Sequence, residues 1–134
     1  MTEFHLKIVT PDGLRFDGMA QQLTVRTVNG DLGILARHIN CVAPLGMGQA
    51  SVTVDGEKRI GACIGGMVSV VEGEVTVVAT TFEWAEDIDR GRAHASEEAA
   101  REILAQKDAS ATQLELARAK LKRALIRQSV YDRK

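Results

Sequence analysis

Hydrophobic and polar residues alternate with a period of two along much of the first 80 residues. The alternation runs in short segments, including residues 4–8, 23–26, 52–54, 60–64, 68–70 and 75–77. This period is typical of β-strands with one buried face. Between the segments stand turn dipeptides such as Asp12-Gly13 and Asn29-Gly30. Because no helix long enough for a crossover between parallel strands interrupts this region, we expect an antiparallel β-sandwich or barrel.

Two adjacent glycines, Gly65 and Gly66, lie between two of these apolar segments. Glycine pairs also occur in phosphate-binding loops, but those loops lead into the first turn of a helix. No helical pattern follows here. The pair therefore predicts a β-bulge or a close approach of two backbones.

The period changes after Trp84. Asp87 is a candidate N-cap, and residues 88, 92, 95, 99 and 103 follow at helical intervals of three or four, with the helix ending near Lys107. Thr112 and Glu115 have the spacing of a capping box, which predicts the start of a second helix there. In that helix, the residues expected on one face are Leu114, Ala117, Leu121, Ala124 or Leu125, and Gln128.

These patterns divide the chain into a β-sandwich over residues 1–84 and an antiparallel helical hairpin over residues 85–134. The connection between the helices is short, and their alanines allow close approach of the two backbones. An alanine-rich seam buries little apolar surface, and burial stabilises the fold by only ~25 cal/mol per Å². Ordering the backbone of each residue costs ~1–2 kcal/mol in conformational entropy. We therefore expect a hairpin of marginal stability that can dock, undock or extend.

Composition is that of an ordinary globular protein, with 45% hydrophobic and 26% charged residues. The amino-terminal residues carry charges where a secretory signal would be apolar, and no apolar run approaches the ~20 residues of a membrane span. We expect a soluble cytoplasmic chain with no direct membrane insertion and with Cys41 and Cys63 reduced.

Charge is distributed unevenly along the chain. Residues 113–134 hold seven Lys or Arg and two Asp or Glu, although the whole chain has a net charge of −1. Such a basic segment can face nucleic acid, a membrane surface, an acidic protein surface or a polyphosphate, or can simply be solvated. The overall charge and the presence of a single Trp and a single Tyr disfavour nucleic acid.

Few residues suggest catalysis or metal binding. His38 and Cys41, with Asp31 nearby, could form a thiol nucleophile and its base, but a cysteine so close in sequence to its histidine is more often structural. His5, His38 and His94 fall in three different predicted elements, there is no CxxC, and neither GxxxxGK[ST] nor GxGxxG occurs. We expect no metal site and no required cofactor.

Charged residues near both ends of the hairpin share helix faces. Asp89 and Arg92 are three residues apart on the first helix, and Arg123 and Arg127 are four apart on the second. Antiparallel docking would bring these groups together. They would form either interhelical ion pairs or a site that holds an anion between guanidinium groups.

Several segments resemble, in order, the epsilon subunit of bacterial F-type ATP synthases. Residues 30–38 (GDLGILARH) resemble the GxLGILPxH segment of that family, with Ala36 and Arg37 where proline and a small residue are common, and His38 is expected to be a structural turn residue. The other matching segments are residues 4–13 (FHLKIVTPDG), 64–70 (IGGMVSV), 75–79 (VTVVA) and 85–93 (AEDIDRGRA), the last with an I(D)xxRA motif.

The resemblance implies a ten-stranded β-sandwich that binds the gamma subunit of the central stalk and touches the membrane rotor c-ring. It also implies helices that extend toward the alpha and beta catalytic subunits and hinder ATP hydrolysis, while catalysis belongs to other subunits. The implied location is the cytoplasmic face of the bacterial cell membrane, in the proton-translocating complex.

In some members of this family the compact hairpin binds ATP. The matching residues here are Ile88, Asp89, Arg92 and Ala93, with Arg123 and Arg127 as further candidates. The basic residues expected to make the inhibitory contact are Arg118, Lys122, Arg123 and Arg127. A stand-alone ATP-sensing or adaptor module is the alternative function.

Overall fold

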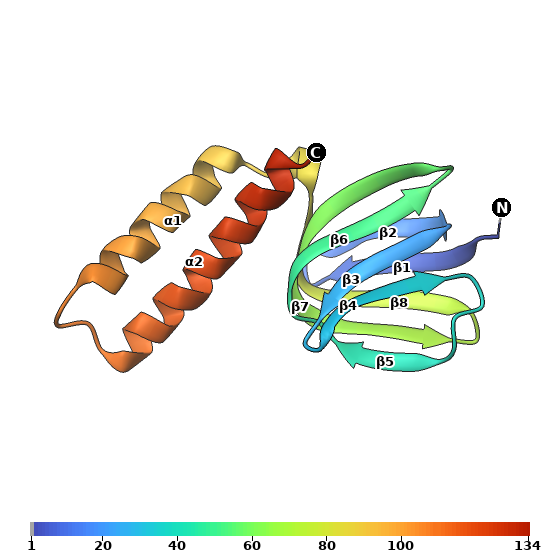
Figure 1. Cartoon of the computed structure of the whole chain (residues 1–134), viewed down its shortest axis with the longest axis horizontal. Coiled ribbons are helices and arrows are strands. Elements are labelled where there is room, and N and C mark those ends of the chain that lie inside the picture. Colours follow the sequence, from blue (N-terminus) through green and yellow to red (C-terminus); the bar gives the residue numbers. More distant parts are fainter. Residues whose placement is uncertain (1) are drawn as a thin grey trace.

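The computed structural model describes residues 2–134 and contains a β-sandwich followed by a helical hairpin (Figure 1). The sandwich comprises strands β1 (Phe4–Thr10), β2 (Gly13–Ala20), β3 (Gln22–Thr27), β4 (Gly30–Leu35), β5 (Cys41–Pro44), β6 (Met47–Val54), β7 (Glu57–Val71) and β8 (Glu74–Trp84). A short 3₁₀ turn, η1 (Ala85–Asp87), leads to helices α1 (Arg90–Ala105) and α2 (Ala111–Asp132). The fold class predicted from the sequence is confirmed.

The strands form one continuous sheet in the order β2-β1-β8-β7-β6-β3-β4, with β5 paired to β7. Neighbouring strands are antiparallel, except that β1 runs parallel to β8. The first half of β7 pairs with β6 and its second half pairs with β5. Strand β7 therefore contributes to both layers of the sandwich, as does its partner β8.

The glycine pair in β7 lies at the change from one layer to the other. Gly65 and Gly66 have φ angles of +70° and +111°. A Cβ atom on Gly66 would lie 1.9 Å from the carbonyl oxygen of Val78, so no side chain fits there. The pairing register with β8 is the same on both sides of Gly65, which excludes a bulge at this point. Of the two expected roles, the close backbone approach is confirmed.

Residues 2–134 contain eight strands, where the resemblance implied ten. Pairing between β7 and β8 extends from Val71 opposite Glu74 to Gly61 opposite Trp84. Because this ladder continues through the bend, β7 and β8 are each counted as one strand, although each contributes a segment to both layers. Counting the two segments of each strand separately would give ten.

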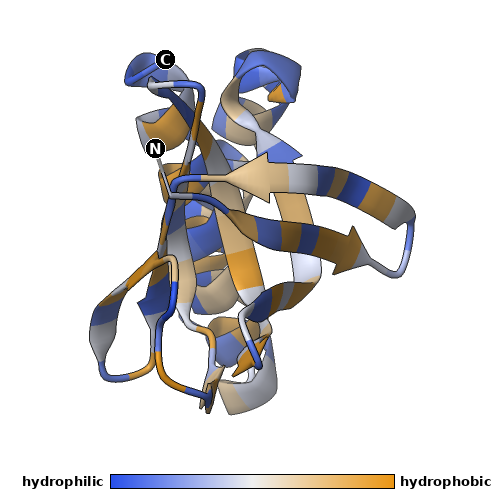
Figure 2. Ribbon diagram, turned by 90° about the vertical axis from the view of Figure 1, so that its right-hand side faces the viewer, coloured by the Kyte–Doolittle hydropathy of each residue, from blue (hydrophilic) through white to orange (hydrophobic). Residues whose placement is uncertain are grey.

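Inward-facing side chains from both layers form a single hydrophobic core. The alternation of hydrophobic and hydrophilic residues along the strands is visible in Figure 2. Near the end of β8, the rings of Phe82 and Trp84 meet edge to face with centroids 4.9 Å apart. The largest fully buried side chains include Leu6, Ile8, Leu23, Val25, Ile34, Val52, Val68, Val70, Val77 and Phe82.

Both helices begin at residues other than those expected. Asp89, and not Asp87, is the N-cap of α1, because Asp87 belongs to the preceding 3₁₀ turn. The capping box of α2 is formed by Ser110 and Gln113, two residues before the predicted pair. The S-x-x-Q spacing provides the same two reciprocal hydrogen bonds, and it allows the helix to start earlier.

The hairpin seam consists of small residues, as predicted. Ala93 and Ala100 of α1 are buried, although the stripe expected on this helix ran through neighbouring positions. On α2 the buried residues include Ala117, Ala124 and Gln128, all on the predicted face. The two helices lie antiparallel, and the end that joins them projects away from the sandwich (Figure 1).

The carboxyl-terminal part of α2 attaches the hairpin to the sandwich. A small apolar cluster contains Ala62 of β7, Ala85 and Ile88 of the link, and Val130 of α2, with Ile60, Ile126 and Tyr131 packed around it. This cluster covers the outer face of β7, whose inner face belongs to the sandwich core. The hairpin thus docks through a few side chains near one end.

Candidate functional site

A cavity of about 430 Å³ lies where the sandwich meets the start of α1. Its walls come from four regions: the end of β1 with the following turn and β2, the end of β8, the link with α1, and one residue of α2. The lining residues are Thr10, Asp12, Arg15, Thr81, Phe82, Glu83, Asp87, Ile88, Asp89, Arg92, Ala93, Ser96 and Arg127. The cavity therefore spans both parts of the chain.

Most of the candidate ATP-binding residues line this one cavity. Ile88, Asp89, Arg92 and Ala93 come from the link and the first turn of α1, and Arg127 reaches the cavity from α2. Arg123 is not among the lining residues, although it is one helical turn from Arg127. The structure thus brings five of the six candidates together.

Sequence reasoning missed the parts of the cavity wall that come from the sandwich, namely Thr10, Asp12 and Arg15 and the end of β8. Arg15 is the extra residue of a β-bulge, because Ile8 pairs with Phe16 while Val9 pairs with Leu14. A bulge redirects its side chain relative to the regular alternation of a strand. Only the tertiary fold brings the β1–β2 hairpin beside α1, so the local sequence pattern contained no signal that these residues line the cavity.

Three guanidinium groups and four carboxylates share the cavity, and several already have partners. Nε of Arg127 donates to Oε1 of Glu83 at 2.7 Å, and Nε of Arg15 donates to the carbonyl of Phe82 at 3.3 Å. Asp89 caps α1 by accepting a hydrogen bond from the backbone N–H of Arg92 at 3.0 Å. An anionic ligand would therefore compete with Glu83 for Arg127.

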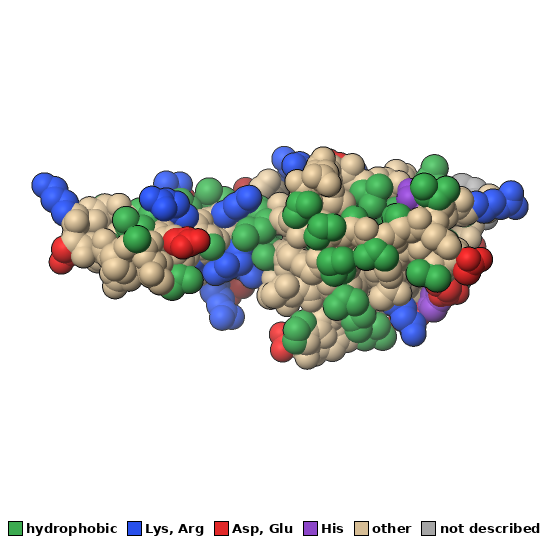
Figure 3. All heavy atoms as spheres, turned by 90° about the horizontal axis from the view of Figure 1, so that it is seen from below, with side chains coloured by type: hydrophobic (Ala, Val, Ile, Leu, Met, Phe, Trp, Pro, Cys, Tyr) green, Lys and Arg blue, Asp and Glu red, His purple; other side chains and the backbone are tan. Residues whose placement is uncertain are grey.

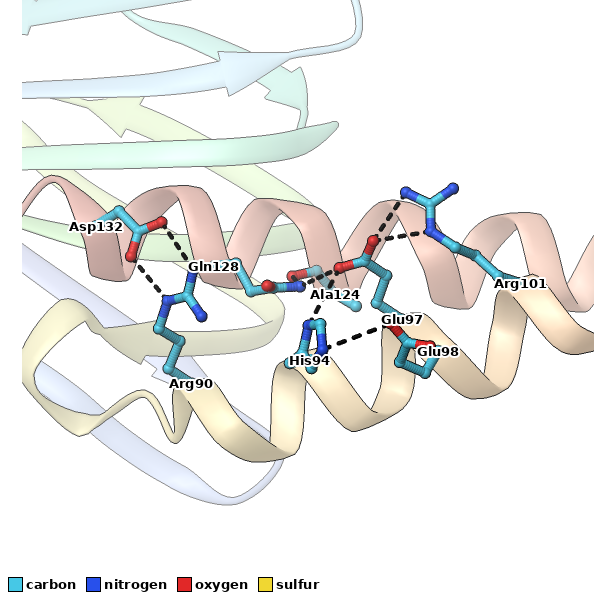
Figure 4. A network of polar contacts seen from close by, with 8 residues as sticks. All are labelled: Arg90, His94, Glu97, Glu98, Arg101, Ala124, Gln128 and Asp132. Atoms are coloured by element: carbon cyan, nitrogen blue, oxygen red, sulfur yellow. Dashed lines mark hydrogen bonds and ion pairs between the residues drawn. The ribbon is translucent and has the colours of Figure 1, made fainter.

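The interhelical ion pair differs from the expected arrangement of charges. Arg90 at the start of α1 binds Asp132 at the end of α2, through contacts of 2.9 and 3.3 Å (Figure 4). The Arg90 guanidinium lowers the pKa of Asp132. Arg127, which was expected to approach the acidic start of α1, instead pairs with Glu83 of the sandwich.

A polar network crosses the hairpin seam next to this pair (Figure 4). Nε2 of the buried Gln128 donates to Glu97 at 2.9 Å, and Nε of Arg101 donates to the same carboxylate at 2.8 Å. These hydrogen bonds, that from Gln128 first, lower the pKa of Glu97. A polar group in a small-residue seam fixes the register of the helices without adding much buried apolar area.

The residues of the candidate thiol site do not form a nucleophile with its base. Sγ of Cys41 lies 4.0 Å from Nδ1 of His38, which is 2.8 Å from the carbonyl oxygen of Ile39. Nδ1 donates to that carbonyl and so has no free lone pair to accept a thiol proton. Asp31 binds Arg26 at 2.8 Å. His38 is a turn residue, as expected, because its backbone N–H donates to the backbone carbonyl of Leu35.

The remaining candidate chemistry is limited. Burial raises the pKa of the Cys63 thiol to about 12, so this thiol stays protonated near neutral pH. Within residues 2–134, no three His, Cys, Asp or Glu side chains are grouped so that they could hold a metal ion. The helices described here include none that is both long and apolar enough to cross a membrane.

The four residues expected to make an inhibitory contact lie along α2. Arg118 and Lys122 are exposed, and Arg123 and Arg127 are half-buried. Of the four, Arg127 is the one held by an ion pair, with Glu83. In the docked hairpin, the exposed pair faces solvent.

Together the fold and its boundary cavity define a class of small proteins in which a β-sandwich is joined to a helical hairpin. Residues 3–85 match the family model described as ATP synthase, Delta/Epsilon chain, beta-sandwich domain. This chain belongs to the ATP synthase epsilon chain family.

Curated relatives extend the similarity to the helices. The ATP synthase epsilon chain of Ruminococcus albus is 37% identical over the whole length of both chains. That of Bacillus subtilis (strain 168) is 42% identical over 104 residues, which cover 78% of this chain and 79% of the relative.

Solved structures share the fold. A chain of the Euglena gracilis mitochondrial ATP synthase, determined as OSCP/F1/c-ring, superposes with a TM-score of 0.70 at 22% identity and covers 98% of this chain and 79% of its own length. A chain of the Tetrahymena thermophila mitochondrial ATP synthase central stalk and c-ring has a TM-score of 0.62 at 15% identity, with 97% of each chain covered.

We predict a raised pKa for His5, whose ring lies between two carboxylates of neighbouring strands. Nε2 is 2.6 Å from Asp17, and Nδ1 is 2.7 Å from Glu74. The hydrogen bond with Asp17, followed by that with Glu74, raises the pKa of His5 above 6.5. The resulting stabilisation is fully present below pH 6.5 and is lost as pH rises through the folded-state pKa.

NMR titration of the imidazole resonances checks this prediction. Asp17→Asn and Glu74→Gln should each lower the pKa of His5, whereas Asp12→Asn, in the turn after β1, should not. A His5 pKa at or below 6.5 in the unsubstituted chain would contradict the assignment.

Proposed function

We propose that the chain is a non-catalytic central-stalk subunit of a bacterial proton-translocating F-type ATP synthase. In this proposal, residues 1–84 attach to the rotor and residues 85–134 regulate the complex from the cytoplasmic face of the cell membrane. The observation that carries the proposal is the similarity to epsilon chains over the sandwich and the helices together. The solved relatives with this fold come from complexes that include F1 and the c-ring or the central stalk.

An exposed apolar row on the sandwich is the surface that we assign to the gamma subunit. The pairing register aligns Pro44, Met67, Val78, Val9 and Leu14 across five strands. Met67, Val78 and Leu14 are 43%, 52% and 53% exposed. Seen from below, hydrophobic side chains lie exposed across the sandwich (Figure 3). A contiguous apolar face of this kind favours a permanent protein partner.

The c-ring and the alpha and beta subunits complete the proposed set of partners. The sandwich would contact the c-ring, and the extended helices would reach the alpha and beta subunits. The exposed Arg118 and Lys122 can meet acidic surfaces of those subunits without breaking an ion pair of the docked hairpin. Arg127 can do so only after it leaves Glu83.

The boundary cavity is the site that we assign to regulatory ATP. Its residues come from the sandwich, the link and both helices, so a ligand there contacts parts that separate when the hairpin extends. Arg92 and Arg127 supply guanidinium groups for phosphate oxygens, and the apolar Ile88 and Ala93 offer contact to a base. At 100 times its dissociation constant, ATP would favour the docked form by roughly 2.7 kcal/mol.

A stand-alone ATP-sensing or adaptor module is the second candidate, which the same cavity would also serve. The two functions differ in their partners. Co-purification with a gamma subunit, and a gene position beside those of the other synthase subunits, are expected only for the stalk subunit.

The first prediction from this proposed function concerns the apolar row. Val78→Asp should weaken binding to the gamma subunit by about 30-fold, because a carboxylate at the centre of an apolar interface loses its hydration. Val28→Asp, at a 61% exposed position in the turn between β3 and β4, is the matched control. The affinity of each variant for purified gamma subunit measures this effect. Equal binding by both variants would contradict the assignment.

The second prediction concerns ATP binding to the full chain, measured by calorimetric titration. Arg92→Ala and Arg127→Ala should each weaken binding about tenfold or more, because each removes a charge-assisted contact. Arg118→Ala removes the same charge from an exposed position outside the cavity and should have little effect. Absence of binding at millimolar ATP would remove the sensor role and leave the stalk assignment intact.

The third prediction concerns inhibition. Replacement of Arg118, Lys122, Arg123 and Arg127 together by Ala should raise ATP hydrolysis by the assembled complex several-fold, since each basic side chain contributes to the extended contact. A steady-state hydrolysis assay of the reconstituted complex measures this effect. Unchanged hydrolysis, with the variant present at full occupancy, would exclude these residues as the inhibitory contact.

A further inference from the structure

A second hollow, of about 350 Å³, lies on the outer face of the layer formed by β3, β4, β6 and the first half of β7. The same face of β7 is apolar at Ile60 and Ala62, where α2 covers it. Beyond α2 its character changes, because all the side chains that line the hollow are polar or charged. The hollow is separate from the boundary cavity and shares no lining residue with it.

The charge of the hollow is positive. Arg26, Lys58 and Arg133 face a single carboxylate, that of Asp31, which binds Nε of Arg26 at 2.8 Å. In the described part of the chain, neither Lys58 nor Arg133 has a carboxylate within ion-pair distance. Two uncompensated cations therefore remain at a surface of low apolar content, where they favour an anion.

Neutral hydrogen-bond donors line the floor between these cations. The register places Thr24 opposite Ser51 and Gln22 opposite Thr53, so three hydroxyls and an amide lie on neighbouring strands. Hydroxyls and side-chain amides can donate to several oxygens of one ligand, while Lys and Arg supply the charge. This combination suits a compact anion with several oxygens better than an apolar or a cationic ligand.

Arg133 contributes to the hollow only when the hairpin is docked. It is the C-cap residue of α2, a position where a basic side chain commonly interacts with the negative end of the helix dipole. Its guanidinium instead extends to the sheet, where Nη1 donates to Oε1 of Gln49 at 3.1 Å. The floor is thus fixed by the sandwich, and one of its cations arrives with α2.

We propose that this hollow binds a small oxyanion of the phosphate class and that its occupancy holds the carboxyl-terminal end of α2 on the sandwich. The cations Lys58 and Arg133 neutralise the ligand, and the strand hydroxyls of Thr24 and Ser51 donate to its oxygens. This site goes beyond the proposed regulatory ATP site, because it lies on another face and uses other residues.

NMR titration of the full chain with inorganic phosphate tests the proposal, with chloride at matched ionic strength as the reference. Saturable shifts are expected at the amides of Thr24 and Ser51. Lys58→Ala and Arg133→Ala should each weaken binding about tenfold. Lys107→Ala is the matched control, because it removes one positive charge from the connection between the two helices, outside the hollow. This variant should leave the phosphate affinity unchanged. Amide exchange at Val130 should slow when phosphate is bound.

Three results would overturn the proposal. The first is the absence of saturable shifts at Thr24 and Ser51. The second is an equal loss of affinity in Lys107→Ala and Lys58→Ala, which would indicate only a general charge effect. The third is saturation confined to Arg92 and Ala93, which would place phosphate in the boundary cavity and leave the ATP proposal standing. Lys58 lies on a strand that does not depend on the docked helix, so its variant remains informative if Arg133→Ala releases α2.

Discussion

Strand β7 is the element on which both parts of the molecule depend. It pairs with β5, β6 and β8, and its bend at Gly65 and Gly66 carries the ladder from one layer of the sandwich to the other. The approach of Gly66 to the carbonyl of Val78 leaves no room for a side chain. Its inner face supplies Val68 and Val70 to the core, while its outer face holds the hairpin. Loss of the bend would therefore disturb the core and the docking surface together.

The two parts are held by interactions of different strength. The sandwich core contains fully buried branched and aromatic side chains from both layers, and each contributes about 1.5–3 kcal/mol on burial. The hairpin seam relies on alanines and on exposed ion pairs such as Arg90–Asp132, whose mutual attraction is screened by solvent. The hairpin touches the sandwich through a small cluster near Val130, with Arg127–Glu83 beside it. A weak seam of this kind supports the proposal that the hairpin leaves its docked position, and the ligands proposed for the boundary cavity and for the hollow would favour the docked form.

Much of the fold could be predicted from local patterns, because the period of two and the period of three to four are physical consequences of strands and helices. The small-residue face of α2 followed directly from this periodicity. Helix starts were harder to place, since Asp87 and Asp89 are equally good caps in sequence and the 3₁₀ turn decided between them. The resemblance implied ten strands and residues 2–134 contain eight, because β7 and β8 each continue through the bend at the two glycines and are counted once.

The candidate site was predictable only in part. The residues from Ile88 to Ala93 are contiguous in the link and the first turn of α1, and they could be recognised by their resemblance to a family motif. The wall that includes Arg15 depends on a bulge and on contact between distant segments, which no local pattern encodes. The choice of Glu83 as the partner of Arg127 is likewise tertiary. Sequence charge identified the basic helix, but only the fold shows which of its cations are already paired.

Amide hydrogen exchange on the full chain is the most direct test of the central claim, that a rigid sandwich carries a hairpin of much lower stability. The account predicts that amides in the hairpin seam, such as Ala100 and Ala117, exchange on the order of 100-fold faster than core amides such as Val68 and Val77. Equal protection of the hairpin and the sandwich core would contradict it, because the two parts would then unfold only as one unit.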